Sequence, residues 1–153
     1  VLAEDAGSRV DAEQLVVVNA RVLPDGTFGA GLAASRGGSL TAAHVYISDS
    51  EAFGVVSADG DSHVTLADAQ VRAADLRTSG RFGSGLFVRG GSLTATRAVL
   101  SGHLQHGAAG LDAASRIELT DTRIERTVSR VMWRKRASNA AAAPSDKRAR
   151  PAK

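Results

Sequence analysis

Apolar residues recur in a fixed three-part order along residues 1–127. The first part is a glycine followed by an aliphatic residue, and it occurs as Gly31-Leu32, Gly54-Val55, Gly85-Leu86 and Gly110-Leu111, with Leu2 taking the same place without a glycine. The second part is a pair of apolar residues two positions apart: Val10/Ala12, Leu40/Ala42, Val64/Leu66, Leu93/Ala95 and Ile117/Leu119. The third part is a single aliphatic residue: Val17, Ile47, Val71, Leu100 and Ile124.

This order predicts short β-strands. Residues i and i+2 of a strand share a face, so each apolar pair points to one side. Alanine-rich stretches such as 67–76 have helical propensity, but the matching positions elsewhere are β-branched, which favours strand. We therefore expect an all-β body of five units with three short strands each, near 1–27, 28–51, 52–81, 82–106 and 107–127.

A longer repeat lies over the five units. GGSLTAAHVYI (37–47) and GGSLTATRAVL (90–100) match at six of eleven positions, which indicates a two-unit repeat of 53 residues. Two long turns, 18–31 and 72–85, recur with it and should project from one side, where a contact surface would most naturally lie.

Stacking of such units places like residues beside one another. A sequence repeat with units of about 20–50 residues is typical of solenoids, whose units bury their apolar faces only against neighbouring units. Parallel stacking predicts one ladder of Leu40, Val64, Leu93 and Ile117 and another of Ile47, Val71, Leu100 and Ile124. Glycine before each first strand suits a positive φ or a close approach of backbones.

The repeat has a Gly-aliphatic step, then Ser-aliphatic-Thr, and later a single aliphatic residue. This sequence pattern resembles the right-handed parallel β-helix repeat of pectate-lyase-like proteins. The resemblance covers residues 2–127 and implies a β-helix (solenoid) of about five coils. It also implies a secreted or cell-surface bacterial protein, with further coils expected on the N-terminal side. The asparagine ladder common in that family is missing, because Asn19 is the only asparagine of residues 1–127.

The amino-acid composition excludes some kinds of functional site. The chain has no cysteine, which excludes disulfides and thiolate metal sites, and aromatic residues make up only 4% of it. No apolar run reaches the length of about 20 residues that a membrane span needs.

Charge divides the chain in two. Residues 128–153 hold eight basic residues and one acid, a net charge of +7, whereas residues 1–127 carry a net charge of −4. We expect 128–136 to form at most a short capping segment, in which Trp133 covers the last unit or lies in solvent. Residues 137–153 are expected to be disordered, so that the tail as a whole is disordered or briefly helical.

The basic tail offers phosphate-neutralising side chains at 134–136 and 147–153. It lacks interleaved aromatic residues for base stacking apart from Trp133, so no nucleic-acid partner is expected.

Two groups of residues suggest metal chemistry. Asp49, Glu51, Asp59 and Asp61 supply part of the oxygen set that calcium requires, although aspartate beside glycine is also ordinary in solvated turns. The lyases that the repeat resembles bind calcium through acidic clusters and use an arginine as base, but no arginine here matches that position.

The histidines are the second group. His103 and His106 have the HxxH spacing of a zinc chelate, but His44 and His63 lie in other turns, so surface histidines are the favoured interpretation. No GxSxG motif occurs, and the Gly-Gly pairs at 37–38 and 90–91 lack the Lys-Ser/Thr of a phosphate loop.

No catalytic, cofactor-binding or metal-binding residue is therefore assigned, and no cofactor is expected. The sequence favours a non-enzymatic structural or surface-display module that contacts a polysaccharide or a surface protein through its long turns. The alternative is a carbohydrate-active module, similar to polysaccharide lyases or hydrolases, whose catalytic coils lie outside this segment.

Overall fold

The computed structural model describes residues 1–22, 29–72, 83–127 and 129–133, and these form fourteen β-strands in two parallel sheets. Sheet A consists, in bonding order, of β1 (Leu2–Glu4), β4 (Ala30–Ser35), β6 (Phe53–Ala58), β8 (Ser84–Arg89), β11 (His106–Gly110) and β14 (Ser129–Trp133). Sheet B consists of β2 (Arg9–Glu13), β3 (Val16–Val18), β5 (Ser39–Ser48), β7 (His63–Arg72), β9 (Ser92–Thr96), β10 (Val99–Ser101), β12 (Arg116–Thr120) and β13 (Arg123–Glu125).

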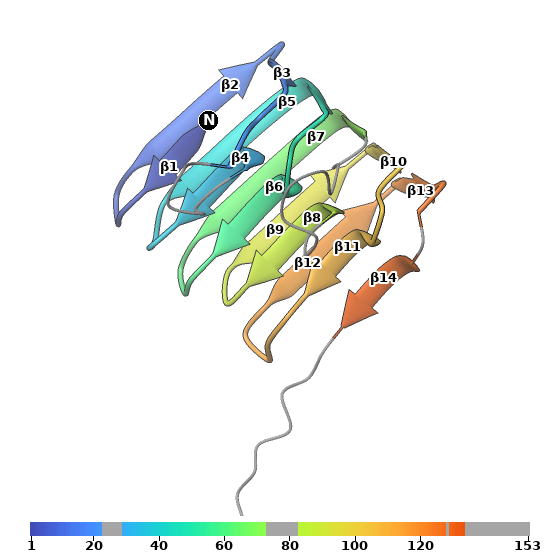
Figure 1. The fold of residues 1–153 in the computed structure, drawn as a ribbon. Helices are drawn as coiled ribbons and strands as arrows, with labels where there is room; N and C mark the ends of the chain where they lie inside the picture. The colour runs from blue at the N-terminus through green and yellow to red at the C-terminus, as the bar shows by residue number, and fades with distance from the viewer. Residues whose placement is uncertain (23–28, 73–82, 128, 134–153) are drawn as a thin grey trace, which may run out of the picture.

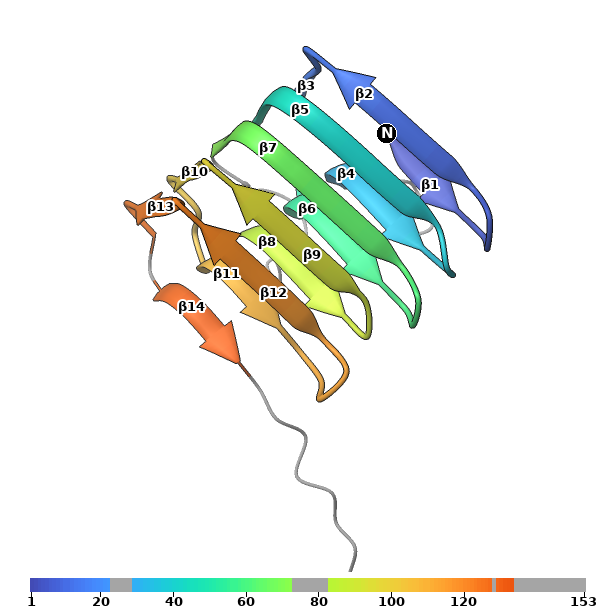
Figure 2. The same ribbon diagram turned by 180° about the vertical axis from the view of Figure 1, so that it is seen from behind.

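The chain passes from sheet A to sheet B and back (Figure 1). We call each passage a level: level one holds β1–β3, level two β4 and β5, level three β6 and β7, level four β8–β10, and level five β11–β13. The sheets face each other, and the view from behind shows the strands of sheet B in the same order along the stack (Figure 2). The predicted all-β, parallel architecture is confirmed.

The predicted ladders are present in the strand register. Leu40 lies opposite Val64, which lies opposite Leu93, which lies opposite Ile117. Ile47, Val71, Leu100 and Ile124 are paired in the same way. Between the sheets, the ladder residues of levels two to four are at most 1% exposed, whereas Ile117 and Ile124 at the end of the stack are only partly buried.

Two predicted alignments are wrong. Leu86 lies opposite Ala108, so the glycine-apolar step of the fifth unit is Gly107-Ala108 and not Gly110-Leu111. Ala108 is fully buried, so a small side chain fills the interior at this position. The pattern of larger aliphatic residues therefore points to Leu111 instead. In level one, Leu2 lies opposite Ala33 and not opposite Leu32.

The recurrence of glycine as the second residue of sheet-A strands reflects close packing of backbones. A Cβ on Gly54 would lie 2.6 Å from the carbonyl oxygen of Gly85, and one on Gly85 would lie 2.7 Å from that of Gly107. Neither position has a positive φ. Of the two reasons expected for these glycines, the close approach applies.

Sheet B bends where residues adopt the left-handed conformation. His44 and Asp68, both with φ of 52°, lie within β5 and β7, which run through the bend as single strands. Levels two and three therefore have two strands rather than the predicted three. Levels one, four and five break at the bend into separate strands.

The start of the basic tail is a strand. β14 pairs in parallel with β11, placing Val131 opposite Ala108, and so extends sheet A by one strand. Residues 129–133 therefore form a strand, and not the short helix or disordered tail that was expected there. The expectation of disorder for 137–153 falls outside the described residues. Within the described ranges the chain forms no helix that could cross a membrane.

Candidate functional site

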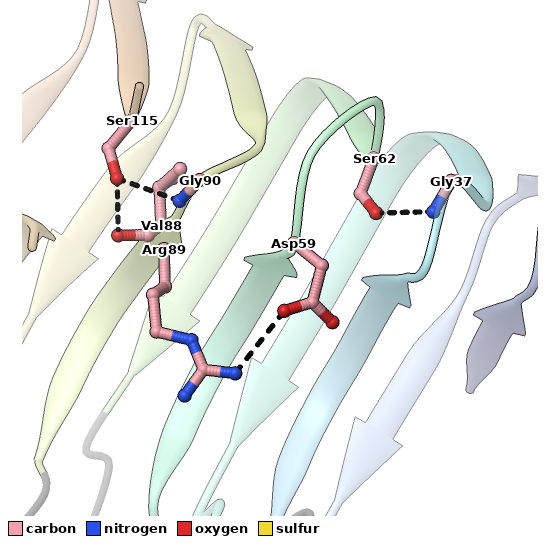
Figure 3. Close-up of polar contacts among 7 residues, drawn as sticks. All are labelled: Gly37, Asp59, Ser62, Val88, Arg89, Gly90 and Ser115. Carbon is pink, nitrogen blue, oxygen red and sulfur yellow. Dashed lines mark hydrogen bonds and ion pairs between the residues drawn. The ribbon is translucent and has the colours of Figure 1, made fainter. Parts of the chain in front are cut away.

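Serine side chains connect neighbouring levels at the turns from sheet A to sheet B (Figure 3). The Ser62 hydroxyl accepts a hydrogen bond from the backbone N–H of Gly37 at 2.9 Å. The Ser115 hydroxyl accepts one from the N–H of Gly90 at 3.0 Å and donates to the Val88 carbonyl at 3.1 Å. The two serines and the two glycines are each 53 residues apart, as the two-unit repeat predicts.

These contacts explain the Gly-Gly pairs. Gly37 and Gly90 have φ of 86° and 85°, a conformation that side-chain-bearing residues rarely adopt. A Cβ on Gly91 would lie 2.9 Å from the Ser62 carbonyl oxygen, so the second glycine permits contact with the level before it. In each pair the first glycine forms the turn and its N–H is bonded by a serine hydroxyl of the next level.

Charged side chains at the same turns pair between levels. Arg89 lies 3.3 Å from the Asp59 carboxylate, and this pair is visible in Figure 3. Arg36 contacts both Glu4 and Asp5 of level one, the latter at 3.0 Å. Each arginine therefore joins its own level to the preceding one.

The bend of sheet B carries a second set of charges. Arg97 donates two hydrogen bonds to the Asp68 carboxylate, both at 2.7 Å. The bond from Arg97 lowers the pKa of Asp68 and keeps that carboxylate ionised. His44 lies one level before Asp68, and Asp121 lies one level after Arg97. Asp68, Arg97 and Asp121 thus alternate in charge along successive levels at this corner.

The four predicted calcium ligands serve separate purposes. Glu51 is 7% exposed and accepts a hydrogen bond from the N–H of Val22 at 2.7 Å. Asp59 pairs with Arg89, while Asp49 and Asp61 are exposed turn residues with positive φ. Among the described residues, no three His, Asp or Glu side chains gather in a way that could hold a metal ion. The calcium hypothesis is therefore wrong for these residues.

His103 is buried, contrary to the expectation of a surface histidine. Its side chain is 1% exposed, and its Nε2 lies 3.1 Å from the Val71 carbonyl oxygen of the preceding level. Burial lowers the pKa of His103 to about 4, so the ring is neutral near pH 7. The ring rests against Gly85, where a Cβ would lie 2.6 Å from Nε2. Only the absence of a side chain at Gly85 leaves room for it.

The other histidines lie apart from His103. His106 begins β11 rather than lying in a turn, and it is half-buried. His63 begins β7, is exposed, and its Nδ1 lies 2.5 Å from the Ser92 hydroxyl of the next level. His44 is exposed at the bend. The structure does not assemble the predicted HxxH pair into a metal site within the described part of the chain.

The outer face of sheet B was not singled out from the sequence, although alternation along each strand would have revealed it. Hydroxyl side chains of β5, β7 and β9 lie in register there, with Thr41 opposite Thr65 and Thr65 opposite Thr94. At both ends of the stack the matching positions are charged: Asp11 precedes Thr41, and Glu118 follows Thr94. This column of the face is thus uncharged in its three central levels and acidic at both ends.

The long turns expected to make contacts lie largely outside the described residues, which omit 23–28 and 73–82. No family model, curated protein or solved structure matches the chain.

Proposed function

We propose that the chain is a non-enzymatic structural or surface-display module, built as a right-handed parallel β-helix of a secreted or cell-surface bacterial protein. In this proposal its long turns contact a glycan or a protein. The observation that carries the proposal is that many polar side chains form hydrogen bonds or ion pairs with the neighbouring level.

Three kinds of contact support this assignment. Serines bond turn glycines across levels, arginines pair with acids across levels, and the buried His103 bonds a carbonyl of the level before it. An active site of the lyase type would instead bring several acids and a base to one strand face. On the outer face of sheet B, the central strands instead align the hydroxyl groups of Thr41, Thr65 and Thr94 in one column.

The test is incubation of the full chain with a glycan array and with soluble polyuronates, followed by measurement of retained protein and of new chain ends. We expect no cleavage, and retention on particular glycans if a glycan is the partner. Replacing 73–82 with glycine and serine should abolish that retention, whereas Thr65→Asp on the outer face of sheet B should leave it unchanged. Cleavage of any polysaccharide would overturn the proposal and favour the carbohydrate-active alternative.

A further inference from the structure

The two ends of the stack carry the same charges at matching positions. In the register of sheet B, one column of outward residues runs Arg9, Ser39, His63, Ser92, Arg116. The adjacent column runs Asp11, Thr41, Thr65, Thr94, Glu118. Each column therefore ends in charges of one sign at both edges, with serine, threonine or histidine between them.

We propose that this pattern, together with β14, prevents copies of the chain from stacking end to end. If β2 of one copy continued the register beyond β12 of another, Arg9 would lie opposite Arg116, and Asp11 opposite Glu118. Like charges directly opposite each other destabilise strand pairing. Within the chain the rule is the reverse, since Asp59 meets Arg89 and Asp68 meets Arg97.

In copies of this chain, the strands at both ends of the stack are otherwise suited to pairing. Edge strands present unpaired backbone groups that template addition of another strand. At level one, Val10 and Val17 are only partly buried, and Val16 is 66% exposed. At level five, Ile117 and Ile124 are also only partly buried. Two such ends would bury apolar surface against each other if charge allowed it.

A shifted register would relieve the charge repulsion only by misaligning the bends of the two copies. Sliding β2 by two residues would bring Arg9 opposite Glu118, but it would move Gln14 away from Asp121. Both residues have positive φ, 56° and 50°, at the bend of sheet B. The bends of the two copies would then no longer coincide, and Val17 would leave the interior column of Ile124.

Sheet A adds a second obstacle at the same end. β14 pairs with β11 just as each earlier sheet-A strand pairs with the next. It therefore occupies the position that β1 of a stacked copy would take. A copy could seat its β2 on β12 only if β14 left β11.

The test reverses the charges of one edge and weakens β14 in the full-length chain. The variant carries Arg9→Glu and Asp11→Lys, which keep the ion pair within β2 in reversed form, with Val131→Pro and Met132→Pro in β14. Because successive N–H groups of a strand point to opposite sides, one proline removes a bond to β11 whichever way β14 faces. Sedimentation across a concentration series should show self-association at least about tenfold tighter than in a control with the prolines alone.

Reversing the other edge as well, with Arg116→Glu and Glu118→Lys, restores like charges and should return the chain to the behaviour of the proline control. Three outcomes would overturn the proposal: end-to-end association of the wild type, no association of the one-edge variant, or equal association of the two-edge variant.

A second measurement needs no proline and no altered β14. Peptides with the sequence of residues 8–18, native or carrying the two reversed charges, are titrated onto the wild-type chain. The reversed peptide should bind at least about tenfold more tightly, and the preference should invert on the chain with Arg116→Glu and Glu118→Lys. Absence of any preference on the two chains would contradict the charge mechanism.

Discussion

The side chain that a position can hold in this protein depends largely on the space that the neighbouring level leaves. Gly85 has no side chain because the His103 ring and the Gly107 carbonyl lie where a Cβ would be. His103 in turn is accommodated only as a neutral ring bonded to Val71. Substitutions at such positions should therefore report on the packing between levels.

His103 predicts a pH dependence of stability. Its folded pKa of about 4 lies below the ordinary value of 6.5, so the unfolded chain binds the proton more readily. Stability is full above about pH 6.5 and falls as the pH drops towards 4, by up to roughly 3 kcal/mol. The carboxylates of Asp68 and Asp112, whose pKa values are lowered from 3.8, lose their contribution only at lower pH.

Urea unfolding between pH 7 and 4 measures this effect. His103→Gln should flatten the pH dependence, while His63→Gln, at an exposed site, should preserve it. Equal slopes for the wild type and His103→Gln would show that another group titrates in this range.

Gly54 tests the close approach of backbones in sheet A. An alanine Cβ would lie 2.6 Å from the Gly85 carbonyl oxygen, and a backbone atom cannot move aside easily. We expect Gly54→Ala to destabilise the fold by about 1–3 kcal/mol. Gly60→Ala is the matched control, since nothing lies within 4 Å of its Cβ position. Similar unfolding midpoints for the two variants would contradict this account of the glycines.

At the scale of elements, β14 is the strand that the sequence concealed. Residues 128–136 lack the glycine-apolar step of the other units, and their basic composition is typical of a solvated tail. The backbone of Ser129–Trp133 nevertheless pairs with β11. Backbone pairing to an open edge depends little on side-chain pattern, which is why the pattern did not reveal it.

Deleting 128–153 should lower the melting temperature by several degrees, because it uncovers the edge of β11. Deleting 134–153 retains β14 and should have a much smaller effect. Circular dichroism during a thermal ramp compares the two. If both truncated chains melted together with the full chain, β14 would contribute nothing to stability.

At the scale of the whole molecule, the interior was predictable from sequence, and the polar contacts were not. The alternating pairs determine which side chains face inward, so the ladders from Leu40 and Ile47 follow from residue order. The glycine of the fifth unit was misplaced because alanine fills the interior at 108, and small residues give a weak hydrophobic signal. The burial of His103 depends on Gly85 and Val71, which are distant in sequence, and no local pattern indicates it.

The candidate site shows the same limit. Asp49, Glu51, Asp59 and Asp61 are close in sequence, yet the structure gives Glu51 to Val22 and Asp59 to Arg89. The four acids were predicted to cluster because they are close in sequence. In the structure, contacts with other levels hold Glu51 and Asp59 at separate places. The Ser62 and Ser115 bonds, in contrast, could have been anticipated from the 53-residue spacing of the Gly-Gly pairs.

The central claim, that neighbouring levels stack in parallel register, is tested most directly by measuring the proximity of paired positions in solution. The chain has no cysteine, so pyrene labels can be attached only where cysteine is introduced. Thr41→Cys with Thr65→Cys places labels on paired, exposed positions of β5 and β7, about 4.8 Å apart for parallel strands. Thr41→Cys with Glu118→Cys places them three levels apart. Strong excimer emission from the first pair and little from the second is the predicted result, and equal emission from both pairs would contradict the parallel stack on which every other inference rests.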